Sequence, residues 1–139
     1  MASFAECEKS SVFELSGGRE MVNEERAVEL LAQIPASDAV TKIRLSNKSF
    51  SEGAASIIAE RLSSFTSLEI ADISDIIAGR PEDEALRVLT IICNSIRTCP
   101  LKEVNVSDNA LGAKGVNACR SILTDKKLEV QTCHKIALL

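Results

Sequence analysis

The sequence of 139 residues predicts an α/β fold built from strand–turn–helix units that repeat along the chain. Three segments have apolar residues that alternate with polar ones, as a short strand with one buried face requires. Each segment is followed by a turn and then by apolar residues at helical spacings of three and four. Equivalent strand positions, Leu45, Ile73 and Val106, lie 28 and 33 residues apart. These periods match long leucine-rich repeats, in which a full helix follows each strand.

The three expected strand segments differ in how closely they follow the repeat pattern. The third, over 101–111, fits L-x-x-L-x-L-x-x-N-x-L with valine in two leucine places. The segments 40–50 and 68–76 carry Lys48 and Ile76 where the pattern has asparagine. Because each unit leaves apolar surface on both flanks, it must stack on its neighbours. The apolar residues of the expected helices are Ala54, Ile57, Ile58, Leu62 and Phe65, then Leu86, Leu89, Cys93 and Ile96, then Val116, Cys119 and Leu123.

The two ends of the chain are expected to differ from the central repeats. A helix over 20–34, with Pro35 after it, is expected to cover the open end of the first repeat. A fourth strand is expected from Leu128, 27 residues after Leu101, although the chain reaches Leu139 without a helix to follow it. We therefore divide the chain into a disordered segment (1–12), a capping helix region (13–39), leucine-rich repeats 1–3 (40–127) and an incomplete fourth repeat or divergent tail (128–139).

The composition argues against several classes of function. A net charge of −4 and an aromatic content of 3 % disfavour a nucleic-acid binder, and the apolar runs are too short for membrane insertion. Five cysteines without C-x-x-C spacing are expected to be reduced thiols, with Cys93 and Cys119 packed in the core. His134, the single histidine, has no organised carboxylate or cysteine partner. We expect no metal, no cofactor and no enzymatic chemistry of the chain's own.

The loop over 77–82 is the most informative stretch for function. Gly79 permits a tight turn and Pro81 fixes the backbone at the helix entry, so Arg80 is expected to project from the rim between strand and helix. Acidic residues follow at 82–84, in the first helical turn. Two interpretations remain open. The Arg80 guanidinium either pairs with Glu82 or Glu84, or is an exposed group that contacts a partner.

The residues around this loop resemble a known family. The stretch 74–86, S-D-I-I-A-G-R-P-E-D-E-A-L, resembles a repeat signature of the Ran GTPase-activating proteins. The stretch 106–112, V-S-D-N-A-L-G, looks like the repeat that follows it there. The stretches 13–19 and 43–50 are similar to the start of the repeat domain in the plant branch. The resemblance covers roughly residues 13–124, and its most specific part is S-D-I-x-x-G-R-P-E.

The resemblance implies a fold, an activity and a set of site residues. The fold is a short crescent of ribonuclease-inhibitor-type repeats, with parallel strands inside and helices outside. The activity is acceleration of GTP hydrolysis on GTP-bound Ran, in nucleocytoplasmic transport. Members of the family bind along the rim and help to order Ran's own catalytic glutamine, unlike an arginine finger. The implied catalytic residue is Arg80, as a contact and positioning residue, and the implied partner-binding residues are Asp75, Gly79, Arg80, Asp108 and Asn109.

Other interpretations accompany this one. The turn-forming alternative for Asp75, Asp108 and Asn109 is that they hydrogen-bond their own backbone. In the family, an asparagine in the rim loop of the next repeat orients Ran's glutamine. In this chain the matching positions fall at about Lys135 and Ile136, so that asparagine is absent. The remaining repeats of the family's crescent are missing too, so the chain is expected to be truncated after about three repeats. The expected molecule is a cytoplasmic monomer, with the nuclear envelope as a further location. The alternative functions are a non-catalytic leucine-rich-repeat binding module and a truncated product of marginal stability.

Overall fold

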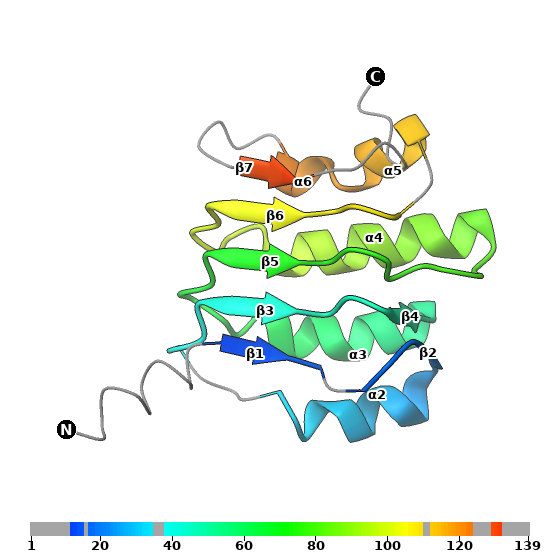
Figure 1. Ribbon diagram of the computed structural model, residues 1–139, viewed down its shortest axis with the longest axis horizontal. Helices are drawn as coiled ribbons and strands as arrows, with labels where there is room; N and C mark the ends of the chain where they lie inside the picture. Colours follow the sequence, from blue (N-terminus) through cyan, green and yellow to red (C-terminus); the bar gives the residue numbers. More distant parts are fainter. Residues whose placement is uncertain (1–11, 16, 35–37, 110–111, 124–128, 132–139) are drawn as a thin grey trace.

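The computed structural model describes residues 12–15, 17–34, 38–109, 112–123 and 129–131. Its main sheet has five strands, all parallel and paired in the order of the sequence. Figure 1 shows them side by side, from the blue strand at one edge to the red strand at the other. The strands are β1 (Val12–Glu14), β3 (Lys42–Arg44), β5 (Ile70–Asp72), β6 (Glu103–Asn105) and β7 (Glu129–Gln131). The prediction of an α/β fold with repeated parallel strands is confirmed.

A second, smaller sheet lies beyond the carboxyl ends of two main strands. It pairs β2 (Glu20–Val22) in parallel with β4 (Lys48–Phe50), so that Met21 lies opposite Ser49. Each of these short strands follows a main strand and precedes a helix in the chain. The small sheet therefore forms part of the edge on which the turns between strands and helices lie (Figure 1).

The helices stack in the same order as the strands (Figure 1). The caps follow from the local sequence, because the side chains of Asn23 and Ser51 accept hydrogen bonds from the first-turn N–H groups of Arg26 and Ala54. Pro81, at the N-cap of the helix over Glu82–Ile96, makes no side-chain hydrogen bond to the first turn. That turn instead holds three acidic residues, which interact favourably with the helix dipole. The helices are α2 (Glu24–Leu31), α3 (Glu52–Leu62), α4 (Glu82–Ile96), α5 (Gly112–Ala118) and α6 (Arg120–Leu123).

The core lies between the sheet and the helices, and it runs through all the units. The middle residue of each central strand is buried, as Ile43, Ala71 and Val104 show. The helices contribute their apolar faces, and α3 packs against both α2 and α4. Cys93 and Cys119 are free thiols with no exposed surface, which confirms their predicted role in packing.

The amino-terminal region differs from the expectation of a single capping helix. The helix begins at Glu24 rather than at residue 20, because Glu20–Val22 pairs with Lys48–Phe50 as strand β2. Residues 12–14, at the start of this region, form strand β1 and extend the main sheet. The region therefore has the same order of elements as the unit that follows: main strand, short strand, helix.

Two further expectations concern the ends and membranes. The fourth strand is confirmed for residues 129–131, which pair with β6 in register. The expected disordered segment falls mostly on residues 1–11, outside the described residues. None of the described helices has the length and apolar character needed to cross a membrane.

Candidate functional site

A turn with the same backbone conformation follows the main strand in three successive units. Asn47, Asp75 and Asp108 occupy equivalent positions and have φ values of 68°, 53° and 62°. Asparagine and aspartate enter this left-handed region more readily than other residues with a side chain. The turn role expected as an alternative for Asp75 and Asp108 therefore has a direct backbone basis. Gly79, further along the loop between β5 and α4, has a φ of 76°, which glycine adopts without strain.

The position after each of these turn residues is fully buried. It holds Lys48, Ile76 and Asn109, all with no exposed surface. The Asn109 amide nitrogen donates to the carbonyl oxygens of Ile73 (2.8 Å) and Val106 (3.2 Å), and its oxygen accepts from the Ile76 N–H at 3.0 Å. Both polar atoms of the buried Asn109 side chain hold the chain turns together, as the turn-forming alternative expects, and a contact of Asn109 with a partner stays a prediction.

Lys48 fills the same position in a different way. Its ammonium donates to the Gly18 carbonyl oxygen and to Glu20 Oε1, both at 2.8 Å, and its side chain is 1 % exposed. Arg26 donates to the other carboxylate oxygen of Glu20 at 2.9 Å. Hydrogen bonds from Arg26 and Lys48 lower the pKa of Glu20 to about 2, against the effect of burial. The ion-paired cluster ties the loop before β2 to the following unit.

Asp75 is in an ion pair rather than open to solvent. Its Oδ2 atom lies 2.5 Å from Nη2 of Arg19, a residue from the loop between β1 and β2. The Asp75 side chain is 13 % exposed, whereas that of Arg19 is 63 % exposed. The accessible group at this point of the rim is therefore a guanidinium, and the sequence analysis did not identify it. Asp108, the equivalent residue of the next unit, is exposed.

Arg80 lies in the loop before α4, as predicted, but its side chain folds back on the small sheet. Its Nη2 donates to the carbonyl oxygens of Ser49 (2.7 Å) and Val22 (3.3 Å), and its Nε donates to the Ser49 hydroxyl oxygen at 3.2 Å. The residue is half-buried rather than fully exposed. The expectation of a freely projecting side chain is thus corrected, because main-chain acceptors from two earlier units lie within its reach.

The expected alternative partners of Arg80 are engaged elsewhere. Glu82 accepts a hydrogen bond from Lys114 Nζ at 2.7 Å, and Glu84 accepts one from the Glu52 N–H at 3.0 Å. Within the part of the chain that the structure describes, no carboxylate lies within ion-pair distance of Arg80, and its Nη1 donates no hydrogen bond. The guanidinium is held by neutral oxygens on one side and keeps donor capacity for an anionic or carbonyl acceptor.

Ser49 is the residue that positions Arg80, and sequence reasoning missed it. Its side chain is buried, and its hydroxyl donates to the Ala78 carbonyl oxygen at 2.6 Å while accepting from Arg80 Nε. Ser49 therefore joins β4 to the loop on both sides of Gly79. No signal within the loop itself could have identified it, since Ser49 lies 31 residues before Arg80.

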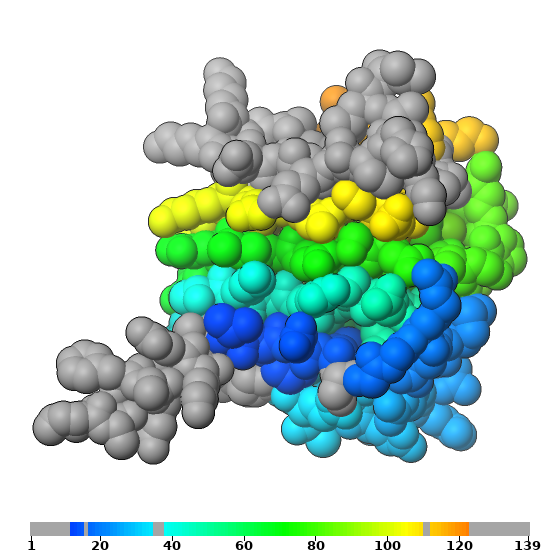
Figure 2. All heavy atoms as spheres, in the orientation of Figure 1, coloured from blue at the N-terminus to red at the C-terminus, as the bar shows by residue number. Residues whose placement is uncertain are grey.

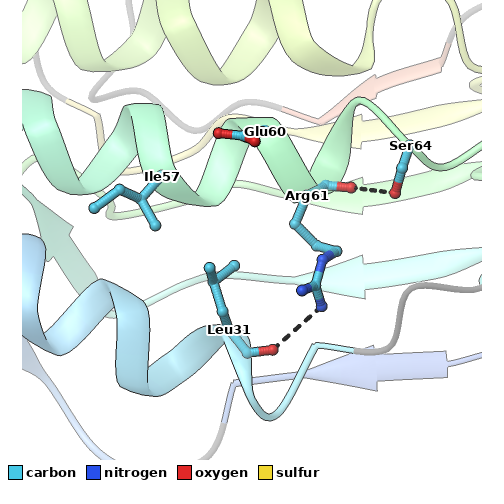
Figure 3. Close-up of a pocket in the computed structure, with 5 residues that line it drawn as sticks. All are labelled: Leu31, Ile57, Glu60, Arg61 and Ser64. Carbon is cyan, nitrogen blue, oxygen red and sulfur yellow. Dashed lines mark hydrogen bonds between the residues drawn. The ribbon is translucent and has the colours of Figure 1, made fainter.

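A hollow lies on the helical side of the molecule, away from the rim. It has a volume of about 290 Å³ and lies between α2 and α3, lined by Leu31, Ile57, Glu60, Arg61 and Ser64 (Figure 3). Arg61 Nη1 donates to the Leu31 carbonyl oxygen at 3.3 Å and also to that of Ile34. The described residues contain no cluster of ligands suited to a metal ion.

Comparisons with known proteins agree with the resemblance seen in the rim loop. No family model matches the chain. The chain is 42 % identical over 117 residues to RAN GTPase-activating protein 1 of Arabidopsis thaliana, and 42 % identical over 118 residues to RAN GTPase-activating protein 2 of the same plant. These matches cover 82 % and 83 % of the chain but 22 % of each relative. A Ran GTPase-activating protein 2 of Caenorhabditis elegans is 30 % identical over 71 % of the chain and 10 % of its own length.

Proposed function

We propose that this chain, a relative of the Ran GTPase-activating proteins, accelerates GTP hydrolysis by the small GTPase Ran in its GTP-bound form. In this role the chain is a regulator of an enzyme, and Ran supplies the catalytic machinery. The proposal includes the finer fold assignment, a leucine-rich-repeat solenoid of the ribonuclease-inhibitor type. Its support is the parallel strand order, the helix that follows each of the main strands β1, β3, β5 and β6, and the buried asparagine in the repeat position.

The observation that carries the proposal is the state of Arg80. It lies within the segment that resembles the family signature, and it holds a positive charge on the rim without a carboxylate partner among the described residues. Two carbonyl oxygens and one hydroxyl fix its position. An ordered guanidinium loses less conformational entropy on binding than a mobile one, which favours a contact with a negatively charged or carbonyl group of a partner.

The same geometry favours a positioning role over that of an arginine finger. A finger must extend into the GTPase site to stabilise the charge of the transferring phosphoryl group. Extension of Arg80 would break its three hydrogen bonds to Val22 and Ser49. We therefore propose that Arg80 stays against the small sheet and contacts the GTPase from there, where it helps to hold Ran's own catalytic residue in place.

The proposed partner surface is the rim formed by the turns after the main strands. Gly79 and Asp108 are exposed on it, and Asp75 contributes through its ion pair with Arg19. The chain spans about 22 % of the length of its Arabidopsis relatives. We propose that this part alone carries the GTPase-activating function named for those longer proteins. The positions expected to match the orienting asparagine lie outside the described residues. We further propose that the chain acts as a cytoplasmic monomer, with the nuclear envelope as a further site of action.

Single-turnover hydrolysis tests the proposal. Ran is loaded with GTP, the purified 139-residue chain is added in excess, and phosphate release is timed against Ran alone. We expect faster release with Ran and no change with a small GTPase of another subfamily. Binding to Ran without any acceleration would contradict the activity and would favour the non-catalytic binding module.

A further inference from the structure

A second feature of the rim lies next to Arg80 and points to a larger contact surface. We propose that Arg19 and Met21 form a further part of the interface with Ran, and that this part receives an apolar side chain of Ran flanked by carboxylates. We call Arg19, Met21, Gly79 and Arg80 the rim patch. The inference rests on the proposed function, since it names further contacts for the same partner.

Met21 supplies the apolar centre of the rim patch. It is 57 % exposed, and among the described residues the other exposed large apolar side chains are Val12 and Val28. Its neighbour Val22 is completely buried, as the alternation of a strand requires. A Cβ atom placed on Gly79 would lie 3.8 Å from Met21 Cε and 4.0 Å from its Sδ. The thioether thus lies beside the bare backbone of the Arg80 loop.

The small sheet brings Met21 and Arg80 together. Met21 is paired in register with Ser49, whose carbonyl and hydroxyl oxygens accept hydrogen bonds from Arg80. The Arg80 guanidinium also reaches the carbonyl oxygen of Val22, the residue after Met21. Methionine adapts its shape to different partners and is common at binding surfaces. An apolar contact at Met21 would therefore be adjacent to any contact made by Arg80.

Arg19 supplies the second cation. It reaches from the loop between β1 and β2 to Asp75 in the loop after β5, and in Figure 2 the blue atoms around β2 lie across the neighbouring units. The ion pair covers the Asp75 carboxylate and leaves the Arg19 side chain 63 % exposed. Together, two guanidinium groups and one carboxylate give the area an excess of positive charge. Complementarity then requires carboxylates on the partner, around a small apolar contact.

Matched substitutions test this surface in the full chain. The affinity for Ran loaded with a non-hydrolysable GTP analogue is measured for Met21→Glu and for Arg19→Ala. The controls are Val28→Glu, which has the same 57 % exposure on α2, and Arg87→Ala, a 54 % exposed arginine that is likewise ion-paired, to Glu52. We expect binding to weaken by about tenfold or more for each rim-patch variant, as for residues near the centre of an interface. The controls should bind as the unaltered chain does.

Two further readouts keep the outcomes distinct. Thermal unfolding of each variant checks that the fold is retained, and a shallower salt dependence of binding is expected for Arg19→Ala because one charge contact is lost. If Arg80→Ala weakens activation while folded Met21→Glu and Arg19→Ala bind normally, the inference is wrong and the proposed function stands. If the unaltered chain neither binds Ran nor accelerates hydrolysis, the proposed function is wrong, and so is the assignment of Ran to the rim patch.

Discussion

Three different side chains occupy one buried position of the repeated unit. Asn109 satisfies main-chain groups of two turns with its amide, Ile76 fills the space with carbon, and Lys48 reaches a carbonyl oxygen and the Glu20 carboxylate. The amide is the most economical solution because it both donates and accepts in a small volume. The lysine needs a paired carboxylate, since an unpaired buried ammonium would be costly.

The role of Asn109 leads to a stability prediction. Asn109→Ala leaves the Ile76 N–H without its acceptor and removes two bonds to carbonyl oxygens. We expect the free energy of unfolding to fall by about 2–3 kcal/mol, as for buried polar groups that lose their partners. Urea-induced unfolding measures the change, with Asn94→Ala on the exposed side of α4 as the control. Equal stabilities for the two variants would show that the amide has no structural role.

Ser49 leads to a prediction about activity. Ser49→Ala removes the hydroxyl that bonds both Ala78 and Arg80, so the loop loses two of its attachments to β4. Given the proposed function, we expect maximal acceleration of Ran's GTP hydrolysis to fall more than affinity for Ran does, because Arg80 itself remains. The control is Ser56→Ala, which changes an exposed hydroxyl on α3. A uniform loss of affinity with unchanged maximal acceleration would contradict a positioning role.

At the scale of elements, the short strands β2 and β4 hold the rim together. Main-chain pairing aligns them, the Lys48–Glu20–Arg26 cluster ties them side chain to side chain, and Arg80 lies across both. Three-residue strands have little stability of their own, so the side chains around them decide whether they persist. The geometry of the proposed site therefore depends on a small sheet braced by ion pairs.

This dependence predicts a specific response to acid. The pKa of Glu20 is lowered to about 2 in the folded chain, from an ordinary value near 4.5. A carboxyl with a lowered pKa stabilises the fold above its ordinary pKa, and this contribution is lost as the pH falls from about 4.5 towards 2. Glu20→Gln should therefore be less stable than the unaltered chain at pH 7, with a difference that shrinks at pH 3. Urea unfolding at several pH values measures it.

A control separates this effect from the removal of any acidic group. Glu25→Gln removes an exposed carboxylate from the first turn of α2. It should change stability at pH 7 by less than Glu20→Gln does. A difference between Glu20→Gln and the unaltered chain that stays constant from pH 7 to pH 3 would contradict the lowered pKa.

At the scale of the whole molecule, the sequence predicts the repeat but not the cross-unit contacts. Period and alternation locate β3, β5 and β6, because their buried positions recur within each unit. Strands β1 and β2 are as short as β3, β5 and β6, but they lie outside the three segments in which the pattern recurs, and they become recognisable only through pairing with β3 and β4. Short strands with little periodicity of their own depend on tertiary context.

In the candidate site, too, the local features could be predicted from the sequence and the long-range contacts could not. The loop position of Arg80 follows from its neighbours Gly79 and Pro81, which the sequence displays. Its acceptors at Val22 and Ser49 are 58 and 31 residues away, and the Arg19–Asp75 pair spans 56 residues. Contacts of this kind depend on how the units stack, which local patterns do not encode. For the same reason the burial of Asn109, between two turns, was not evident from its polar side chain.

The most direct test of the account is single-turnover GTP hydrolysis on Ran with the Arg80→Ala chain, beside Arg87→Ala as a control arginine on α4. The account predicts that the unaltered chain and Arg87→Ala accelerate hydrolysis equally, and that Arg80→Ala loses at least about tenfold of the acceleration while its thermal unfolding remains cooperative. Acceleration by Arg80→Ala equal to that of the unaltered chain would contradict the claim that the guanidinium held on the small sheet carries the activity.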